Sequence, residues 1–158
     1  MLDAIDVRIL SLLQRNARIA NAEVARDLEM APSAVLERIR KLESRGYITS
    51  YETRLAPKLV GLGLTAFIFV KSDETSGWEA TSDALASISE VQEVHNIAGE
   101  DCFLVKVRLR DTDHLASVLR DKLRVIPHIR STRTTIVLET VKETSQLKLD
   151  VETQEVAT

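Results

Sequence analysis

The sequence has few cysteines, aromatic residues and prolines. Its 158 residues include one cysteine, one tryptophan, two tyrosines, three phenylalanines and three prolines. A single cysteine, Cys102, excludes an internal disulfide framework and a cysteine-cluster metal site, and it fits a reducing cytoplasm. Because aromatic residues make up only 4% of the chain, aliphatic side chains have to build the core.

Long apolar runs and a basic leader are also absent. No apolar run approaches the roughly 20 residues that a membrane helix needs. The first residues, "MLDAIDVRIL", carry acids where an export signal would carry lysine or arginine. With 44% hydrophobic and 28% charged residues, the composition is typical of a soluble globular protein. We therefore expect a cytoplasmic protein without a membrane partner.

Charge is distributed unevenly along the chain. Residues 1–60 contain 10 lysines and arginines against 8 acids, whereas residues 61–158 contain 11 against 16. The net charge of −3 thus hides a basic first third and an acidic remainder. This asymmetry predicts two modules with different partners.

Three helices are predicted in the basic module, over residues 3–15, 21–29 and 32–45. Asp3 is a good N-cap for the first of them. Pro32 suits the first turn of the third helix, and Gly46 suits its C-terminal end. A short turn between the second and third helices is typical of the helix-turn-helix arrangement.

The third helix, within "APSAVLERIRKLESRG", divides into an apolar face and a polar face. Val35, Ile39 and Leu42 fall on one side and predict contact with the other helices. The other side carries the residues that would meet double-stranded DNA. Base edges would be met by Ser33, Ala34 and Glu37, and phosphates by Arg38, Arg40, Lys41 and Arg45. The pattern alone leaves open a small helical bundle with a solvated charged face.

The rest of the chain alternates strand and helix patterns. "YITSYETRLAP", residues 47–57, predicts a strand followed by a linker. Further strands are expected at 64–72, 91–98, 102–110 and 129–141, and helices at 77–89 and 112–125. Because 64–72 is apolar at both alternating positions, it is expected to be buried on both faces. The order β-α-β-β-α-β predicts a ferredoxin-like module, whose uncovered sheet face a second copy of the chain would cover.

The N-terminal 57 residues resemble the Lrp/AsnC (feast/famine) transcription regulators. The resemblance rests on Leu2-Asp3 with Asp6, on "RIANAEVA" and on "VLERIRKLESRGYI", and the second half fits the same plan. It implies an α+β protein with a helix-turn-helix (winged-helix-like) domain at 1–50 and a strand or linker at 51–62. A ferredoxin-like effector-binding and oligomerisation domain would occupy 63–142, followed by a C-terminal extension at 143–158. A short edge strand at Leu147, Leu149 and Val151 is also expected.

Function is implied by the same resemblance: DNA-binding regulation by a homodimer or a larger assembly such as an octamer. A small effector, typically an amino acid, would bind between subunits. "AGEDCFLVKV" occupies the place of the family's effector loop, although Asp101 and Cys102 replace its usual aromatic and acid. Candidate effector contacts are Gly99, Glu100, Asp101 and Cys102, with Thr132, Thr134 and Thr135 on the last strand. An ordinary solvated turn is the alternative for this loop.

Three departures from the family pattern concern local stability. Ala20 and Ala31 stand where serine often caps the second and third helices, and each missing cap costs about 1 kcal/mol. Glu29 stands where glycine often supplies a left-handed turn residue. We therefore expect a locally weak helix-turn-helix that orders further on DNA.

The same plan leaves two other functions open. A siroheme-decarboxylase-like enzyme shares this plan and would use histidine and arginine. His95, His114 and His128 are scattered, however, and show no metal-ligand spacing, so no enzyme, metal or cofactor is expected. An effector-binding module with a vestigial head is disfavoured because the basic residues of the third helix are retained.

Overall fold

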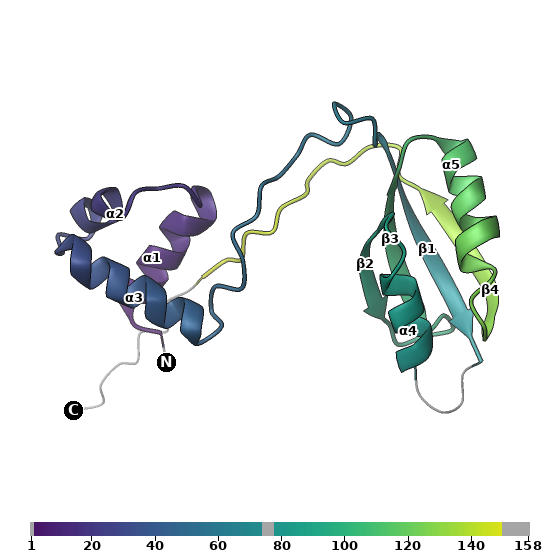
Figure 1. The fold of residues 1–158 in the computed structure, drawn as a ribbon, viewed down its shortest axis with the longest axis horizontal. Coiled ribbons are helices and arrows are strands. Elements are labelled where there is room, and N and C mark those ends of the chain that lie inside the picture. Colours follow the sequence, from purple (N-terminus) through teal and green to yellow (C-terminus); the bar gives the residue numbers. More distant parts are fainter. Residues whose placement is uncertain (1, 74–77, 150–158) are drawn as a thin grey trace. The chain divides into compact units, whose positions relative to one another are not determined.

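The computed structural model describes residues 2–73 and 78–149. The chain forms two compact units (Figure 1). The first contains the residues up to Arg54 and those from Glu143 onward, and the second runs from Leu55 to Lys142. In the described residues, no helix is long and apolar enough to cross a membrane.

The first unit is built from three helices, which we call the head. They are α1 (Ala4–Arg15), α2 (Asn21–Asp27) and α3 (Pro32–Ser44). Their inner faces form one apolar cluster, and its fully enclosed members include Ile9, Val24 and Val35. Ile39 and Leu42 are buried as predicted, so the 3.6-residue period correctly separates the packed face of α3 from the exposed one.

Local signals set the ends of these helices. The carboxylate of Asp3 accepts a hydrogen bond of 2.7 Å from the backbone N–H of Asp6, which confirms the predicted N-cap. Gly46 adopts a φ of +76° just beyond α3, and its N–H donates to the carbonyl of Glu43. A glycine adopts this left-handed conformation without a Cβ clash, which is why the helix ends there.

The second unit is a four-stranded sheet with helices on one face. Its elements are β1 (Leu64–Ser72), α4 (Glu79–Ala86), β2 (Val91–Asn96), β3 (Phe103–Leu109), α5 (Thr112–Ser117), the π-helical turn η1 (Val118–Leu123) and β4 (Ile129–Ile136). The strands lie in the order β2-β3-β1-β4, and all neighbours are antiparallel. This is the predicted ferredoxin-like βαββαβ fold, so the chain as a whole is α+β.

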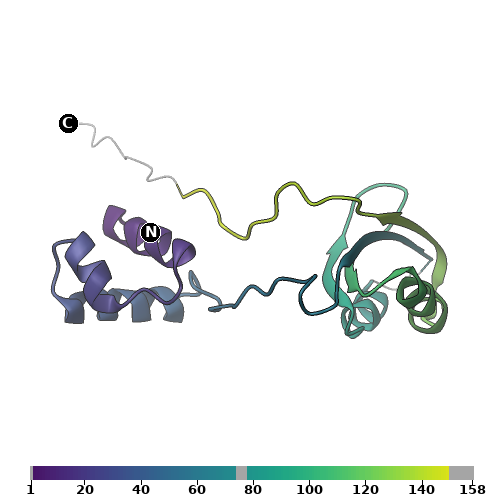
Figure 2. The same ribbon diagram turned by 90° about the horizontal axis from the view of Figure 1, so that it is seen from above.

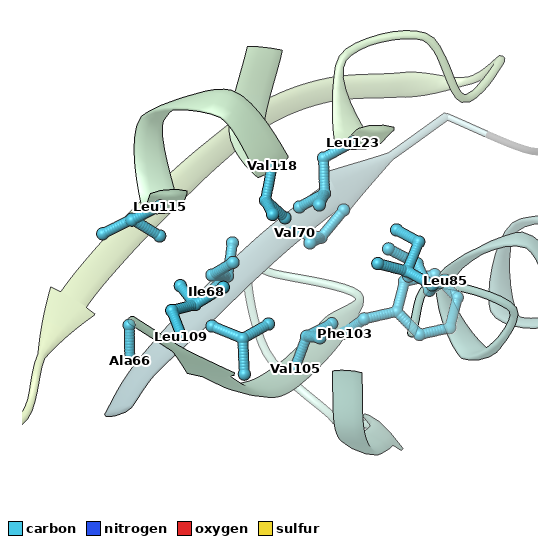
Figure 3. Close-up of a cluster of buried hydrophobic side chains, with 12 residues drawn as sticks. Ala66, Ile68, Val70, Leu85, Phe103, Val105, Leu109, Leu115, Val118 and Leu123 are labelled. Carbon is cyan, nitrogen blue, oxygen red and sulfur yellow. The ribbon is translucent and has the colours of Figure 1, made fainter. Parts of the chain in front are cut away.

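Helices α4 and α5 cover the same face of the sheet (Figure 2). Between them and the sheet lies a core of aliphatic side chains with Phe103 (Figure 3). Ile68 and Val70 of β1 are fully buried in this core, whereas Phe67 and Phe69 on the other face are only half-buried. Within one chain, β1 is therefore buried on one face only, which differs from the expectation of two buried faces.

Several predicted boundaries are wrong, and two of the errors have one cause. Residues 47–57 form no strand, because no neighbouring strand supplies ladder hydrogen bonds. β4 ends at Ile136 rather than at 141, since β1, its partner, begins at Leu64. The expected edge strand is not formed at Leu147 or Leu149, and Val151 lies outside the described residues.

The predicted helices are also longer than the observed ones. The second ends at Asp27 rather than 29. The fourth spans Glu79–Ala86, and the start predicted for it, residue 77, lies outside the described residues. The helix predicted over 112–125 is divided into α5 and the wider π turn η1, a feature with no signal in the apolar spacing.

Candidate nucleic-acid interface and effector loop

The polar face of α3 carries the residues predicted to meet DNA. Val35, Ile39 and Leu42 hold the helix to the head, so the remaining positions point outward. Half-buried positions are Ala34 and Arg38. Exposed positions are Ser33, Glu37, Arg40, Lys41 and Arg45. Six of the seven predicted residues thus lie on α3, outside its packed face, and Arg45 is its C-cap. The N-terminal trio is small or acidic, while the remainder is basic.

The turn that leads into α3 has the weaknesses that the sequence predicts: no side-chain caps, and no glycine at its left-handed position. Glu29 adopts a φ of +53°, a left-handed conformation that costs a residue with a Cβ roughly 1 kcal/mol. Neither Ala20 nor Ala31 makes a side-chain cap hydrogen bond. The turn is closed by backbone bonding, since the N–H of Met30 donates to the carbonyl of Ala25 at 2.9 Å.

The charged side chains of α3 differ in their partners. Lys41 Nζ lies 2.7 Å from Glu37 Oε1, one helical turn away, and this hydrogen bond lowers the pKa of the Glu37 carboxyl. Among the described residues, no ion pair holds Arg40 or Arg45. Those two guanidinium groups are therefore available to phosphate without breaking an internal pair.

Arg38 is placed differently from the other cations. Its Nη1 donates to Asp3 Oδ2 at 2.7 Å and to Asp6 Oδ1 at 2.8 Å, both at the start of α1. The two acids raise the pKa of Arg38 through these hydrogen bonds. The pKa of Asp3 is lowered, first by the N–H of Asp6 and then by Arg38. A hollow of about 430 Å³ adjoins this group, and Ala34 and Lys41 also line it.

The segment from Glu143 to Leu149 returns to the head. The side-chain amide of Gln14 donates to the carbonyl of Leu147 at 3.2 Å and accepts from its N–H at 2.7 Å. The amide of Gln146 donates to the carbonyl of Gln14, and Leu149 packs against the apolar cluster of the head. This docking has no sequence signal, because the partners lie more than 130 residues apart.

The predicted effector loop lies between β2 and β3. Gly99 has a φ of +145°, which favours glycine. Asp101 is held by Arg133 of β4, with 3.1 Å between Oδ2 and Nη2, and that guanidinium also stacks 4.0 Å from the ring centroid of Phe69. Glu100 is exposed. Cys102 is half-buried, and its thiol contacts the backbone of Ser72 at 3.4 Å.

The three predicted threonines do not share one face of the sheet. Thr132 and Thr134 pair with Val70 and Ile68, whose side chains point to the helices. Thr135 pairs with Phe67 on the open face, the face that also carries Arg133. Alternation along the strand therefore places only Thr135 on the same face as Arg133. The sequence prediction missed Arg133, although its even spacing from Thr135 within the strand would have indicated it.

The histidines are separated and each has its own acidic neighbour. His95 contacts Glu93, His114 contacts Glu90, and His128 lies 3.6 Å from Asp73. In the described part of the chain, no group of three or more His, Cys, Asp or Glu side chains could hold a metal ion.

Comparison with known proteins identifies the family. A family model for a winged helix-turn-helix DNA-binding domain matches residues 2–49, and one for the Lrp/AsnC ligand-binding domain matches residues 65–147. The leucine-responsive regulatory protein of Haemophilus influenzae is 33% identical over 94% of this chain and 90% of its own length.

Solved structures agree with these matches. A transcriptional regulator of Neisseria meningitidis, solved with L-methionine, has a TM-score of 0.90 and 29% identity over 95% of this chain and 98% of its own. AsnC of Escherichia coli has a TM-score of 0.86 and 31% identity over 92% and 98% of the two chains. The head and the sheet module together define a DNA-binding transcription regulator. The chain belongs to the Lrp/AsnC family.

Proposed function

We propose that this regulator binds double-stranded DNA with α3 in the major groove. The observation that carries the proposal is the division of α3 into a buried apolar face and an exposed face that is basic toward its C-terminal end. In a helix-turn-helix protein, the second helix of the motif enters the major groove, and its first residues meet the base edges. Ser33, Ala34 and Glu37 take this position, as the sequence predicts.

Phosphates are contacted by Arg40, Lys41 and Arg45. Their side chains are exposed, and within the described ranges 2–73 and 78–149 no acid pairs with the first or the last of them. Lys41 has to exchange Glu37 for a phosphate oxygen, and this exchange frees the Glu37 carboxylate to accept from a cytosine amino group. Arg38 differs from these three cations, because two carboxylates already hold it.

The open face of the sheet is the proposed homodimer interface. It carries the half-buried rings of Phe67 and Phe69, with Leu104 opposite Phe69 on β3. Exposed apolar area of this kind favours association, and a two-fold dimer would place two copies of α3 in successive major grooves. Assembly of dimers into a larger oligomer such as an octamer follows the family plan.

An amino acid is the proposed effector, and the loop at 99–102 its proposed site. The amides beside Gly99 suit an α-carboxylate, and Glu100 or Asp101 suits an ammonium group. The L-methionine bound to the Neisseria regulator supports an amino acid as the class of ligand. Since Asp101 is paired with Arg133, a bound ammonium would compete with that guanidinium or share the carboxylate with it.

The effector changes DNA occupancy through assembly or head placement. It acts only if it binds the competing assemblies with different affinities. We place this regulator in the cytoplasm, with no catalytic role and no resident cofactor. The naming of its relatives as regulators favours this function over a decarboxylase on the same fold.

A gel-shift assay tests the proposal with the DNA upstream of this protein's own gene. We expect selective binding over a shuffled duplex and an affinity that falls about 10³-fold or more between 50 and 200 mM salt, as phosphate contacts require. The absence of selective binding at low salt would contradict the proposal. A thermal-shift survey of the amino acids tests the effector separately.

A further inference from the structure

The start of α1 and the middle of α3 are joined by one cluster of charged groups. Arg38 bridges Asp3 and Asp6 through a single nitrogen, at 2.7 and 2.8 Å. Asp6 keeps 15% of its side chain exposed, Arg38 31% and Asp3 52%, so the contact between Asp6 and Arg38 is the part withdrawn from water. We call these three residues the Asp3–Asp6–Arg38 cluster.

The geometry of Asp3 makes this cluster unusually well defined. One carboxylate oxygen of Asp3 accepts from the backbone N–H of Asp6 as the N-cap of α1, and the other accepts from Arg38. The cap fixes the carboxylate relative to the axis of α1, and the guanidinium then fixes α3 relative to that carboxylate. Charge-assisted hydrogen bonds in fixed directions orient groups as well as attract them.

The hydrophobic contacts between α1 and α3 leave a need for this orientation. Aliphatic packing is non-directional and tolerates small sliding of one helix on another. Base readout does not tolerate it, since a side chain must reach its base edge within hydrogen-bonding distance. Glu37 and Ala34, predicted to face bases, lie one residue and one helical turn before Arg38 on the same helix, so a shift at Arg38 shifts them too.

We propose that Arg38 is a positioning residue for DNA readout, which sets the placement of α3 through Asp3 and Asp6 and does not itself contact phosphate. This inference rests on the proposed DNA-binding role of α3. It differs from the sequence-based expectation, which groups Arg38 with the phosphate contacts on spacing alone. The two roles predict opposite effects when the acids are neutralised.

Two single variants, Asp6→Asn and Asp3→Asn, test the proposal. Fluorescence anisotropy measures the affinity of each variant for the selected duplex and for the shuffled one. Asparagine retains the N-cap at position 3 while removing the charge. If Arg38 contacts phosphate, each variant releases Arg38 and removes a negative charge near DNA. Each variant should then bind both duplexes at least as tightly as the wild type does. If Arg38 positions α3, the affinity for the selected duplex falls about tenfold relative to the shuffled one, the size of one lost base contact.

Two controls separate positioning from charge and from stability. Glu23→Gln removes one exposed acid from the head and should leave the ratio of the two affinities unchanged. Far-UV circular dichroism checks that each variant is folded, and a loss of folded protein would weaken both duplexes equally. If Asp6→Asn does not fold, Asp3→Asn and the measurement below decide the question.

Salt dependence gives an independent readout. Replacing a phosphate contact reduces the slope of log K against log[salt] by about 1 for each copy of the chain on the DNA, and so by about 2 for a dimer. We expect this reduction for Arg45→Gln and a much smaller one for Arg38→Gln. An equal reduction for both variants, or acid variants that keep full selectivity, would overturn the inference. If the wild type itself shows no selectivity, it is the proposed function that fails.

Discussion

Single residues at the turn before α3 determine how firmly this helix, proposed to contact DNA, is held. Ala31 is the N-cap, with a φ of −68° and a ψ of 138°, but it offers no side-chain acceptor. Glu29 adds the cost of a left-handed conformation. Both features are predicted from the sequence, because the resemblance to the Lrp/AsnC pattern shows that Ala31 and Glu29 stand where serine and glycine are usual.

Ala31→Ser should stabilise the head by about 1 kcal/mol, since the serine hydroxyl can accept from the N–H of Ala34. Amide hydrogen exchange over residues 20–33 measures the effect, and Ala17→Ser, at an exposed turn position, is the matched control. In the wild type, we expect these amides to be weakly protected without DNA and more protected with it. Full protection in the free protein would contradict a weak turn.

Contacts between residues far apart in the chain could not be predicted from the spacing of single residues. The partners of Arg38 lie 35 and 32 residues before it, and spacing within α3 gives no hint of them. Helical spacing identifies which residues leave the packed face, but it does not identify what each one meets. The exposed face of α3 is therefore predictable from spacing, and its contact with DNA stays a prediction, whereas the ion pairs of Arg38 are known only from the structure.

At the scale of elements, the partly buried carboxylate of Glu90, the residue before β2, joins that strand to α5 and η1. Lys122 Nζ donates to both carboxylate oxygens of Glu90 at 2.7 Å, and His114 Nε2 lies 3.2 Å from one of them. Lys122 is the main cause that lowers the pKa of Glu90 from 4.5 to about 2. The π turn is what brings Lys122 into this position, an arrangement that apolar periodicity does not encode.

Glu90→Gln should therefore change how stability depends on pH. Because the folded pKa lies below the unfolded one, the pair contributes fully above about pH 4.5, and its contribution is lost as pH falls toward 2. At pH 6 the substitution should lower the free energy of unfolding by on the order of 1 kcal/mol, since Lys122 is partly hydrated. Urea unfolding followed by Trp78 fluorescence measures it. A wild-type advantage that persists unchanged at pH 2 would refute this account.

The segment Glu143–Leu149 is part of the head. The amide of Gln14 binds the backbone of Leu147 in two directions, and Leu149 packs on the apolar cluster. Leu149→Ala should destabilise the head by about 1 kcal/mol, as expected for partial burial. Faster exchange of the Ile9 and Leu10 amides would report it. The control is Leu138→Ala, whose side chain is 99% exposed; equal effects of the two variants would argue against docking.

Strand prediction succeeded and failed for one physical reason. β1, β3 and their helices have the expected order, because each strand has a partner and a buried face. The segment over 47–57 has strand-forming residues, but no strand in the described part of the chain pairs with it, so it stays irregular. Residue propensity selects segments that suit a sheet, whereas pairing decides which of them form one.

At the scale of the whole molecule, the open sheet face predicts self-association. Phe67→Asp would place a charge among half-buried rings, so it should shift a dimer or larger assembly toward monomer. Sedimentation velocity measures the change. Val125→Asp is the control, because that side chain is 69% exposed beyond η1. If Phe67→Asp leaves the assembly unchanged, a different surface holds the copies together.

The central claim is that α3 reads DNA sequence in the context of a symmetric assembly. Selection of binding sites from a random duplex library tests it most directly. We predict enrichment of a pseudo-palindrome whose half-sites lie about 10 base pairs, or a multiple of that, apart. A Ser33→Ala/Glu37→Ala variant should lose preference at defined positions within each half-site. A library that shows no enrichment at low salt, or an enriched site unaffected by that variant, would contradict the claim.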